Sequence, residues 1–217
     1  MKVNLIQKLI SATRFERYLI AAGNKGQRAI RLYKANLRIA KAFHPVLGLF
    51  EIILRNCLNE ELKIHFKDAD WAINKKHLLT TVMVQGIRDV ERRLQKKGGV
   101  ITNSKIIADQ NFGFWTQQLE KQVFKILGGS PIHAFKNLPK NMNRADISRR
   151  LNDIRVFRNR INHNEPICFK ADQIDFLEME KIYGLIHEVL DWLDPEAKKL
   201  IFEIDTVRKE IEKAKRI

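Results

Sequence analysis

The residue types best suited to chemistry gather in one short segment, from Arg158 to His163, with Asn159 directly after the arginine. An imidazole can take or give a proton near neutral pH. A guanidinium can hold a phosphate through its fork of donors and can stabilise charge that develops on it. The set Arg158, Asn159 and His163 therefore suits cleavage of RNA, in which the 2′-hydroxyl is an internal nucleophile and no metal ion is strictly needed.

The spacing of Arg158 and His163 also has a simpler interpretation. Arginine-rich helices are common in basic proteins, a single histidine is often only a surface or core residue, and short motifs recur by chance. Spacing alone therefore favours a non-catalytic helix over a catalytic one.

The stretch 144–164 is expected to be a helix, in which Arg158 has an unusual position. Ile147, Leu151, Ile154 and Ile161 form an apolar stripe, and Arg158 lies on the same stripe. A buried arginine is costly unless it is paired, so Arg158 needs a partner, a cleft or an interface. His163 follows about 140° further around the helix axis, with Asn159 between the two.

Hydrophobic spacing predicts an all-α protein. Glycine and proline are scarce, at 10 and 5 residues, and no segment is better explained as a strand. Pro45 is expected to end, restart or kink the helical stretch around it. The expected fold is a helical bundle with an N-terminal arm over 1–43, a core over 44–194 and a charged C-terminal helix over 195–217. Helices are predicted over residues 5–22, 27–43, 46–66, 74–97, 104–127, 144–164, 173–193 and 196–214.

The chain is strongly basic, with a net charge of +15. A protein this basic usually meets a polyanion, and RNA is the expected partner. The alternative is a solvated basic surface. A run of basic residues leads into the Arg158 segment, and we predict that it carries an RNA backbone: Lys136, Lys140, Arg144, Arg149, Arg150, Arg155 and Arg160.

Two further groups of residues have alternative interpretations. Glu51 and Arg55 are one helical turn apart on a mostly apolar helix, so they either support Arg158 and His163 or form an ordinary ion pair. Phe112, Phe114 and Trp115 could stack on RNA bases, but core packing is the favoured interpretation.

Several classes of protein are not expected. The two cysteines, Cys57 and Cys168, suit a reducing cytoplasm better than a disulfide framework. The histidines lack metal-ligand spacing, so we expect neither a metal nor a cofactor. No secretory signal is visible, and no apolar stretch approaches the roughly 20 residues that span a bilayer.

A family resemblance gives the Arg158 segment more weight. Residues 154–167 resemble the "LRNRIAHHEPI" signature of Abi-like proteins, which are bacterial phage-defence (abortive infection) proteins of the HEPN superfamily. Other matches follow in family order over residues 11–167: Ser11–Leu19, Leu32-Tyr33 with Asn36, Phe50–Asn56 and Phe112–Trp115.

The resemblance implies a HEPN-like bundle with an R-x4–6-H motif. In active relatives this motif supports metal-independent RNA cleavage, usually across the cleft of a homodimer. Carried over, the site residues are Arg158, Asn159 and His163; the sequence departs from the family at Asn162 and Asn164. The expected function is a phage-defence toxin that cleaves RNA. The alternatives are a non-cleaving protein held by a small RNA, and a dimeric interaction scaffold.

Overall fold

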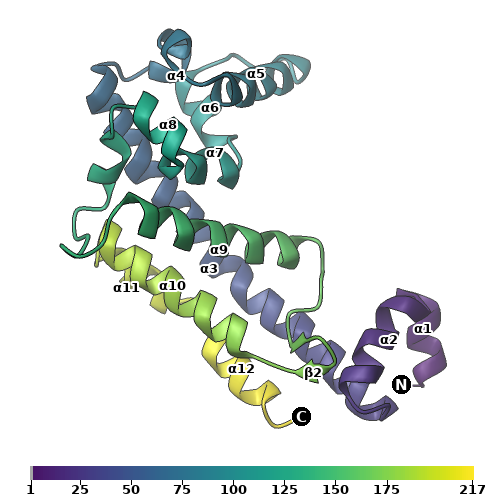
Figure 1. Ribbon diagram of the computed structural model, residues 1–217. Coiled ribbons are helices and arrows are strands. Elements are labelled where there is room, and N and C mark those ends of the chain that lie inside the picture. Colours follow the sequence, from purple (N-terminus) through teal and green to yellow (C-terminus); the bar gives the residue numbers. More distant parts are fainter. Residues whose placement is uncertain (1) are drawn as a thin grey trace. The chain divides into compact units, whose positions relative to one another are not determined.

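Helices make up most of the chain. The structure is a computed structural model that describes residues 2–217 (Figure 1). Helical residues account for 73% of the chain, which confirms the predicted all-α class. The twelve α-helices of the described residues are α1 (Val3–Ile10), α2 (Ala12–Ala21), α3 (Gly26–Phe66), α4 (Trp71–Asn74), α5 (Thr81–Lys96), α6 (Asn103–Ala108), α7 (Phe112–Thr116), α8 (Lys121–Ile126), α9 (Arg144–Asn162), α10 (Leu177–Leu193), α11 (Ala197–Phe202) and α12 (Val207–Ala214).

Short 3-10 helices and one small hairpin complete the fold. The 3-10 helices are η1 (Lys76–Leu78), η2 (Gln117–Leu119) and η3 (Ser130–Ala134). Strands β1 (Phe169–Lys170) and β2 (Gln173–Ile174) pair antiparallel, with Phe169 opposite Ile174. The prediction that no segment forms a strand is therefore wrong here. The next helix starts at Leu177 instead of residue 173, because the hairpin occupies the preceding residues.

The chain divides into two compact units. Unit 1 contains residues 2–48, 156–187 and 200–217, and unit 2 contains residues 49–155 and 188–199. The helices α3, α9, α10 and α11 each contribute residues to both units.

In unit 1, aromatic side chains join α3 to α9. The rings of Phe43 and Phe157 meet edge to face at 5.0 Å, and both side chains are fully buried. Tyr18 of α2 packs edge-on against Phe169 of the hairpin, with ring centroids 5.2 Å apart. These contacts bury large apolar area between segments far apart in the sequence, which is the main source of stability in such a bundle.

Pro45 does not interrupt α3. A proline inside a helix removes one backbone hydrogen bond and costs about 3 kcal/mol. Pro45 is exposed, while Phe43, Val46 and Leu47 beside it are at most 3% exposed. Burial of these three side chains offsets the cost of the proline, so the expected pair of helices is one continuous helix.

In unit 2, one predicted helix over 104–127 is replaced by three short ones. The side chain of Thr102 accepts a hydrogen bond from Lys105 N and so caps α6. The side chain of Asn111 accepts one from Phe114 N at 2.9 Å and caps α7. Glu120 has extended backbone angles before α8. These local breaks overrule a hydrophobic pattern that fits one long helix.

The predicted last helix, 196–214, is also two helices. Residues between α11 and α12 form a turn, in which the Asp205 carboxylate accepts a hydrogen bond from Val207 N at 2.8 Å. An aspartate that accepts from the backbone two residues later forms a local turn, and this turn separates the two helices.

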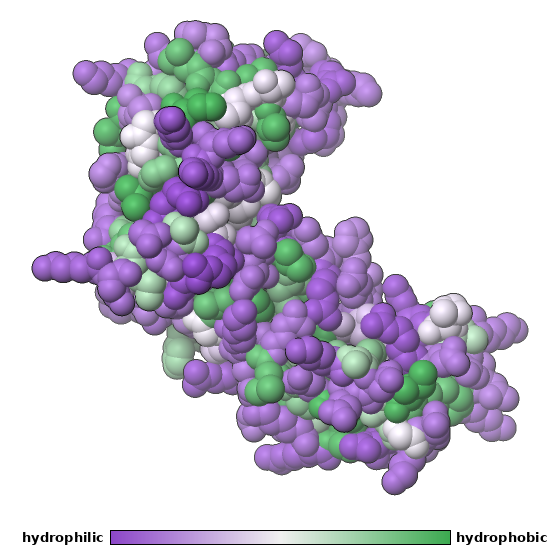
Figure 2. Space-filling model, viewed as in Figure 1, coloured by the Kyte–Doolittle hydropathy of each residue, from purple (hydrophilic) through white to green (hydrophobic). Residues whose placement is uncertain are grey.

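The aromatic block in α7 is part of the core. Phe112, Phe114 and Trp115 are at most 3% exposed, in agreement with the core-packing interpretation. On the face shown in Figure 2, hydrophilic side chains cover most of the surface and hydrophobic ones form small patches. None of the helices over residues 2–217 is long and apolar enough to cross a bilayer.

Candidate functional site at the end of α9

The C-terminal end of α9 carries the predicted site residues. Ile154 is fully buried and Ile161 is 2% exposed, so the predicted stripe does face the interior. Arg158 is half-buried at the edge of this stripe, and Asn159 and His163 are exposed. All three site residues belong to unit 1. The helix therefore supports Arg158 from its buried side and exposes the amide and the imidazole.

The backbone that carries His163 is held in a regular helix ending. His163 N donates to Asn159 O at 2.9 Å, Asn164 N to Ile161 O at 2.9 Å, and Glu165 N to Arg160 O at 2.8 Å. Asn164 has a φ of 53°, which lies in the left-handed region. This is the Schellman arrangement, in which a residue of left-handed conformation closes the helix and satisfies its last carbonyl groups.

Arg160 fastens the segment that follows His163. Its guanidinium donates to Glu178 Oε2 at 2.5 Å and to Pro166 O at 2.6 Å, and it lies 3.6 Å from the carboxylate of Glu165. The next residue, Ile167, donates its N–H to the buried Asn36 side chain at 2.7 Å. These contacts hold the chain in place directly after the candidate site. In this structure the Arg160 guanidinium therefore has a structural role.

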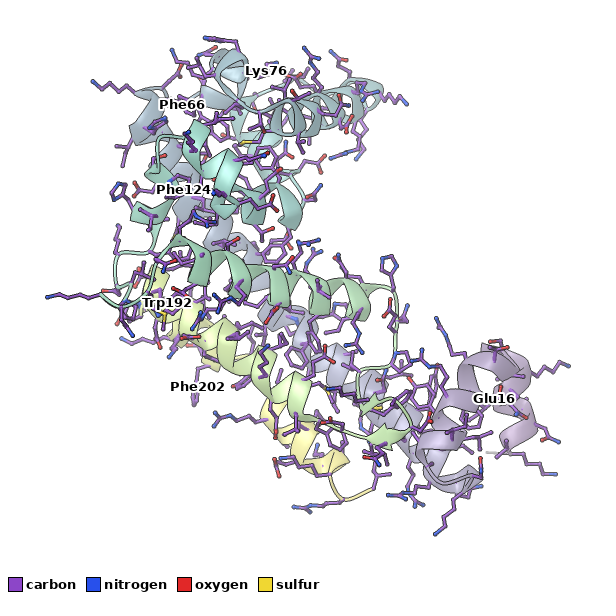
Figure 3. All side chains as sticks on the ribbon, in the orientation of Figure 1. Glu16, Phe66, Lys76, Phe124, Trp192 and Phe202 are labelled. Carbon is purple, nitrogen blue, oxygen red and sulfur yellow. The ribbon has the colours of Figure 1, made fainter. Side chains whose placement is uncertain are left out.

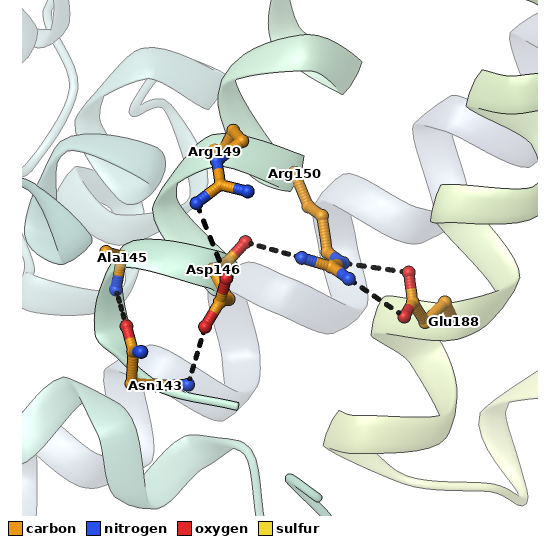
Figure 4. Close-up of polar contacts among 6 residues, drawn as sticks. All are labelled: Asn143, Ala145, Asp146, Arg149, Arg150 and Glu188. Carbon is orange, nitrogen blue, oxygen red and sulfur yellow. Dashed lines mark hydrogen bonds and ion pairs between the residues drawn. The ribbon is translucent and has the colours of Figure 1, made fainter. Parts of the chain in front are cut away.

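Arg150, another residue of the predicted RNA track, is held between α9 and α10. Its guanidinium donates to both carboxylate oxygens of Glu188, at 2.8 and 3.2 Å, and to Asp146 O (Figure 4). It also lies 4.8 Å from the ring centroid of Trp192, which is labelled in Figure 3. The hydrogen bond from Arg150 to Glu188 is the main cause of a raised pKa for this arginine. A bidentate pair of this kind fixes geometry between two helices.

Arg144 is also used within the fold. Its Nη1 donates to Leu119 O at 2.6 Å, and its guanidinium lies 5.9 Å from the ring centroid of Phe124. Arg144, Arg150 and Arg160 are therefore engaged in contacts that hold helices and loops together, which leaves less of the predicted track for RNA.

The remaining basic residues of the track are more accessible. Lys136 and Lys140 are exposed before α9. Arg149 is 69% exposed in its side chain, with Asp146 3.4 Å away. Arg155 is half-buried and donates to Asn152 Oδ1 at 2.6 Å. These four residues all belong to unit 2.

Glu51 and Arg55 lie on the part of α3 that belongs to unit 2. There Arg55 donates to Ala108 O at 3.1 Å and to Asn56 Oδ1 at 3.4 Å. Its observed contact therefore holds α6 against α3, so the predicted support of Arg158 or His163 by Arg55 remains a prediction.

A polar cluster in unit 1 was not anticipated from the sequence. The Tyr183 hydroxyl donates to Asp205 Oδ2 at 2.5 Å, and His187 Nε2 lies 3.5 Å from the same oxygen. Burial is the main cause that raises the pKa of Tyr183 to about 12. Burial raises the pKa of Asp205, but contacts with His187, Tyr183 and the Val207 N–H together hold it below its usual value. The only signal in the sequence is an aspartate two residues before Val207, a spacing typical of a local turn, and it does not reveal the partners on α10.

Neither cysteine thiol is suited to act as a nucleophile. Cys168 is fully buried, and burial raises the pKa of its thiol to about 12. Burial also raises the pKa of the half-buried Cys57. A thiol with a raised pKa is a poor nucleophile. Over residues 2–217, no three His, Cys, Asp or Glu side chains form a group that could hold a metal ion.

In comparisons with known proteins, no family model, no curated protein and no solved structure matches this chain.

Proposed function

We propose that this chain is a metal-independent endoribonuclease of HEPN type that acts as a toxin in bacterial phage defence. The observation that carries the proposal is the arrangement at the end of α9. Arg158 is half-buried and supported by the apolar stripe, while Asn159 and His163 are exposed on a backbone held by a closed helix ending. The resemblance of residues 154–167 to the Abi-like signature assigns Arg158, Asn159 and His163 to RNA cleavage.

The chemistry follows from the three side chains. His163 takes the proton from a 2′-hydroxyl, and the 2′-oxygen forms a bond to the adjacent phosphorus. The bond from phosphorus to the 5′-oxygen breaks, and that oxygen leaves with a proton. The products are a 2′,3′-cyclic phosphate and a 5′-hydroxyl. Arg158 holds the phosphate and stabilises its added charge, and Asn159 orients the imidazole or a phosphate oxygen.

One histidine can serve as base and then as acid only in separate steps. In the proposed homodimer, His163 of a second copy gives the second proton.

The test compares His163→Ala with the wild-type protein on single-stranded RNA, without added metal and with chelator present. Wild type should generate ends with cyclic phosphate, and His163→Ala should lower the cleavage rate at least 100-fold, as expected for loss of a general acid–base. His44→Ala is the matched control, because His44 is also exposed and belongs to unit 1. Cleavage by His163→Ala at the wild-type rate would contradict the proposal.

The second candidate function is RNA binding without cleavage. It is favoured by the net charge of +15 and by Asn164, which stands where the family signature has a second histidine. In that case RNA affinity survives in His163→Ala, and wild type produces no new RNA ends. Sequencing of RNA ends after brief induction in cells distinguishes the two functions.

A further inference from the structure

An exposed row of cations runs along the part of α3 that belongs to unit 1. Between Glu16 and Glu51 the chain contains no acidic residue. Positions three and four residues apart lie on one face of a helix, and the cations of this row have that spacing. At 1.5 Å per residue the row is about 15 Å long. Its members, all exposed, are Arg31, Lys34, Arg38 and Lys41.

Two further cations lie beside this row on α12. The two helices are held side by side, because the Arg38 guanidinium lies 3.4 Å from the Glu210 carboxylate. The Arg28 guanidinium donates to Ile217 O at 3.1 Å and so joins the same helices at a second point. Glu210 also accepts from Lys213 at 2.6 Å, which places Lys213 on the side of α12 nearest to α3. One helical turn earlier on this side is Lys209, and both lysines are exposed.

These cations of α3 and α12, which we call the basic face, are only partly neutralised within the fold. Glu210 is 15% exposed in its side chain and pairs with Arg38 and Lys213. The hydrogen bond from Lys213 is the main cause that holds the pKa of Glu210 below its usual value, with a further contribution from Arg38. Over residues 2–217, no carboxylate forms an ion pair with the other cations of the α3 row, which are Arg31, Lys34 and Lys41.

The spacing of the basic face is unfavourable in the protein alone. Like charges three or four residues apart destabilise a helix, and every neighbouring pair in the α3 row has this spacing. Lys209 and Lys213 repeat it on α12. On α5, by contrast, Arg93 pairs with Asp109 at 3.0 Å. A row of cations whose repulsion is not relieved within the fold indicates a surface that meets a polyanion.

We propose that the basic face binds the phosphate backbone of the RNA substrate. This inference rests on the proposed function, which supplies the RNA. The basic face belongs to unit 1, which also contains Asn159 and His163. Cations that contact phosphates hold a strand without reading its bases. The basic face therefore contributes affinity for RNA of any sequence, and Glu210 keeps the cations of α3 and α12 next to one another.

The side chains around the cations favour RNA over an anionic membrane. A helix that lies on a membrane inserts large apolar side chains beside its cations. Within residues 25–48 and 206–217, the one large apolar side chain that is exposed is Leu37, at 42%. Leu32, Ile39 and Val207 are fully buried in the core. The basic face thus offers charge with little apolar area, which suits a phosphate backbone.

The test measures the affinity for a short single-stranded RNA at several salt concentrations, in the His163→Ala protein so that the RNA stays intact. Lys34 and Lys41 are both replaced by glutamine. The slope of log affinity against log salt concentration should fall in magnitude by about 1.4, because each phosphate contact of a single strand contributes about 0.7. At 0.1 M salt, loss of the same two contacts corresponds to an affinity about 25-fold lower. The melting temperature should stay the same or rise, because repulsion along α3 is relieved.

The double variant Lys8→Gln with Lys170→Gln is the matched control. Both lysines are exposed in unit 1 and lie outside the basic face. This control removes the same charge and should leave the slope and the affinity unchanged. An equal fall in slope for the two double variants would overturn the basic face, because net charge alone would then explain the effect.

The remaining outcomes separate this inference from the proposed function. Equal slopes and affinities for the Lys34 and Lys41 variant and its parent would overturn the basic face, while RNA cleavage by wild type tests the proposed function independently. Absence of RNA binding by the parent would overturn both. Sedimentation with vesicles of phosphatidylserine and phosphatidylcholine tests a membrane instead. A loss of vesicle binding that the control lacks, with RNA affinity unchanged, would assign the basic face to lipid and overturn the proposal.

Discussion

Asn164 shows how a single residue can be explained by backbone geometry. It is exposed, and its φ of 53° closes α9. Most L-residues pay about 1–2 kcal/mol for this conformation, while asparagine and glycine adopt it more easily. Asn164 therefore has a structural role, at the ending that holds His163.

This explanation predicts effects of different size for two small replacements. Asn164→Ala should lower the free energy of unfolding by about 1 kcal/mol, and Asn164→Gly should change it by only a few tenths. Chemical denaturation measures both values. Equal destabilisation by alanine and glycine would show that the side-chain amide, and not the left-handed backbone, matters at this position.

Among the elements, the turn from α11 to α12 depends on Asp205. Its carboxylate accepts hydrogen bonds from Val207 N, at the start of α12, and from the Tyr183 hydroxyl of α10. Because the side chain of Asp205 is only 8% exposed, these hydrogen bonds hold the ionised carboxylate in place. The turn thereby fixes the end of the chain to α10.

The pH dependence of this contact follows from the lowered pKa of Asp205. The stability it contributes is present above the unfolded-state pKa of about 3.9 and is lost as pH falls through the lower folded-state pKa. Asp205→Asn should therefore lower the free energy of unfolding by about 2 kcal/mol at pH 7. The difference from wild type should shrink below about pH 4.

Thermal unfolding followed by circular dichroism between pH 3 and 7 measures this difference. Asp172→Asn serves as the control, since Asp172 is exposed in the same unit. A difference between Asp205→Asn and wild type that stays constant down to pH 3 would argue against the ionised carboxylate as the source of stability.

At the scale of the whole molecule, the charge of +15 predicts salt-dependent binding of RNA. Each contact between a cation and a phosphate of a single strand adds about 0.7 to the slope of log affinity against log salt concentration. Lys136 and Lys140 are exposed on the predicted track, whereas Arg144 and Arg150 are held by internal contacts. Lys136 and Lys140 should therefore contribute more to this slope than Arg144 and Arg150.

Replacing both Lys136 and Lys140 by glutamine should remove two contacts with phosphates. The slope of log affinity against log salt concentration should then fall in magnitude by about 1.4. The pair Lys96→Gln and Lys97→Gln removes the same charge from exposed positions of unit 2 outside the track. Filter binding at four or more salt concentrations provides the slopes. Equal slopes for the two double variants would place the RNA elsewhere on the surface.

The sequence by itself determined the helical class and the buried stripe of α9. It placed Arg158 on that stripe, and the structure places it half-buried at the edge of the stripe. It could do so because helical periodicity is local and records which face of each helix is buried. The same reasoning was wrong where it divided residues 27–66 into two helices, at the three short helices over 103–126 and at the hairpin. There, tertiary burial or a single capping side chain outweighed the hydrophobic pattern.

Only the tertiary structure decided which polar side chains have partners within the fold. Arg150 and Glu188 are 38 residues apart, and Arg144 meets a carbonyl 25 residues earlier in the chain. Arg38 and Glu210, which are far apart in the chain, lie 3.4 Å from each other. A charge in a sequence has the same appearance whether it faces solvent or a distant carboxylate, because the distance between the two groups is set by the packing of the helices that carry them.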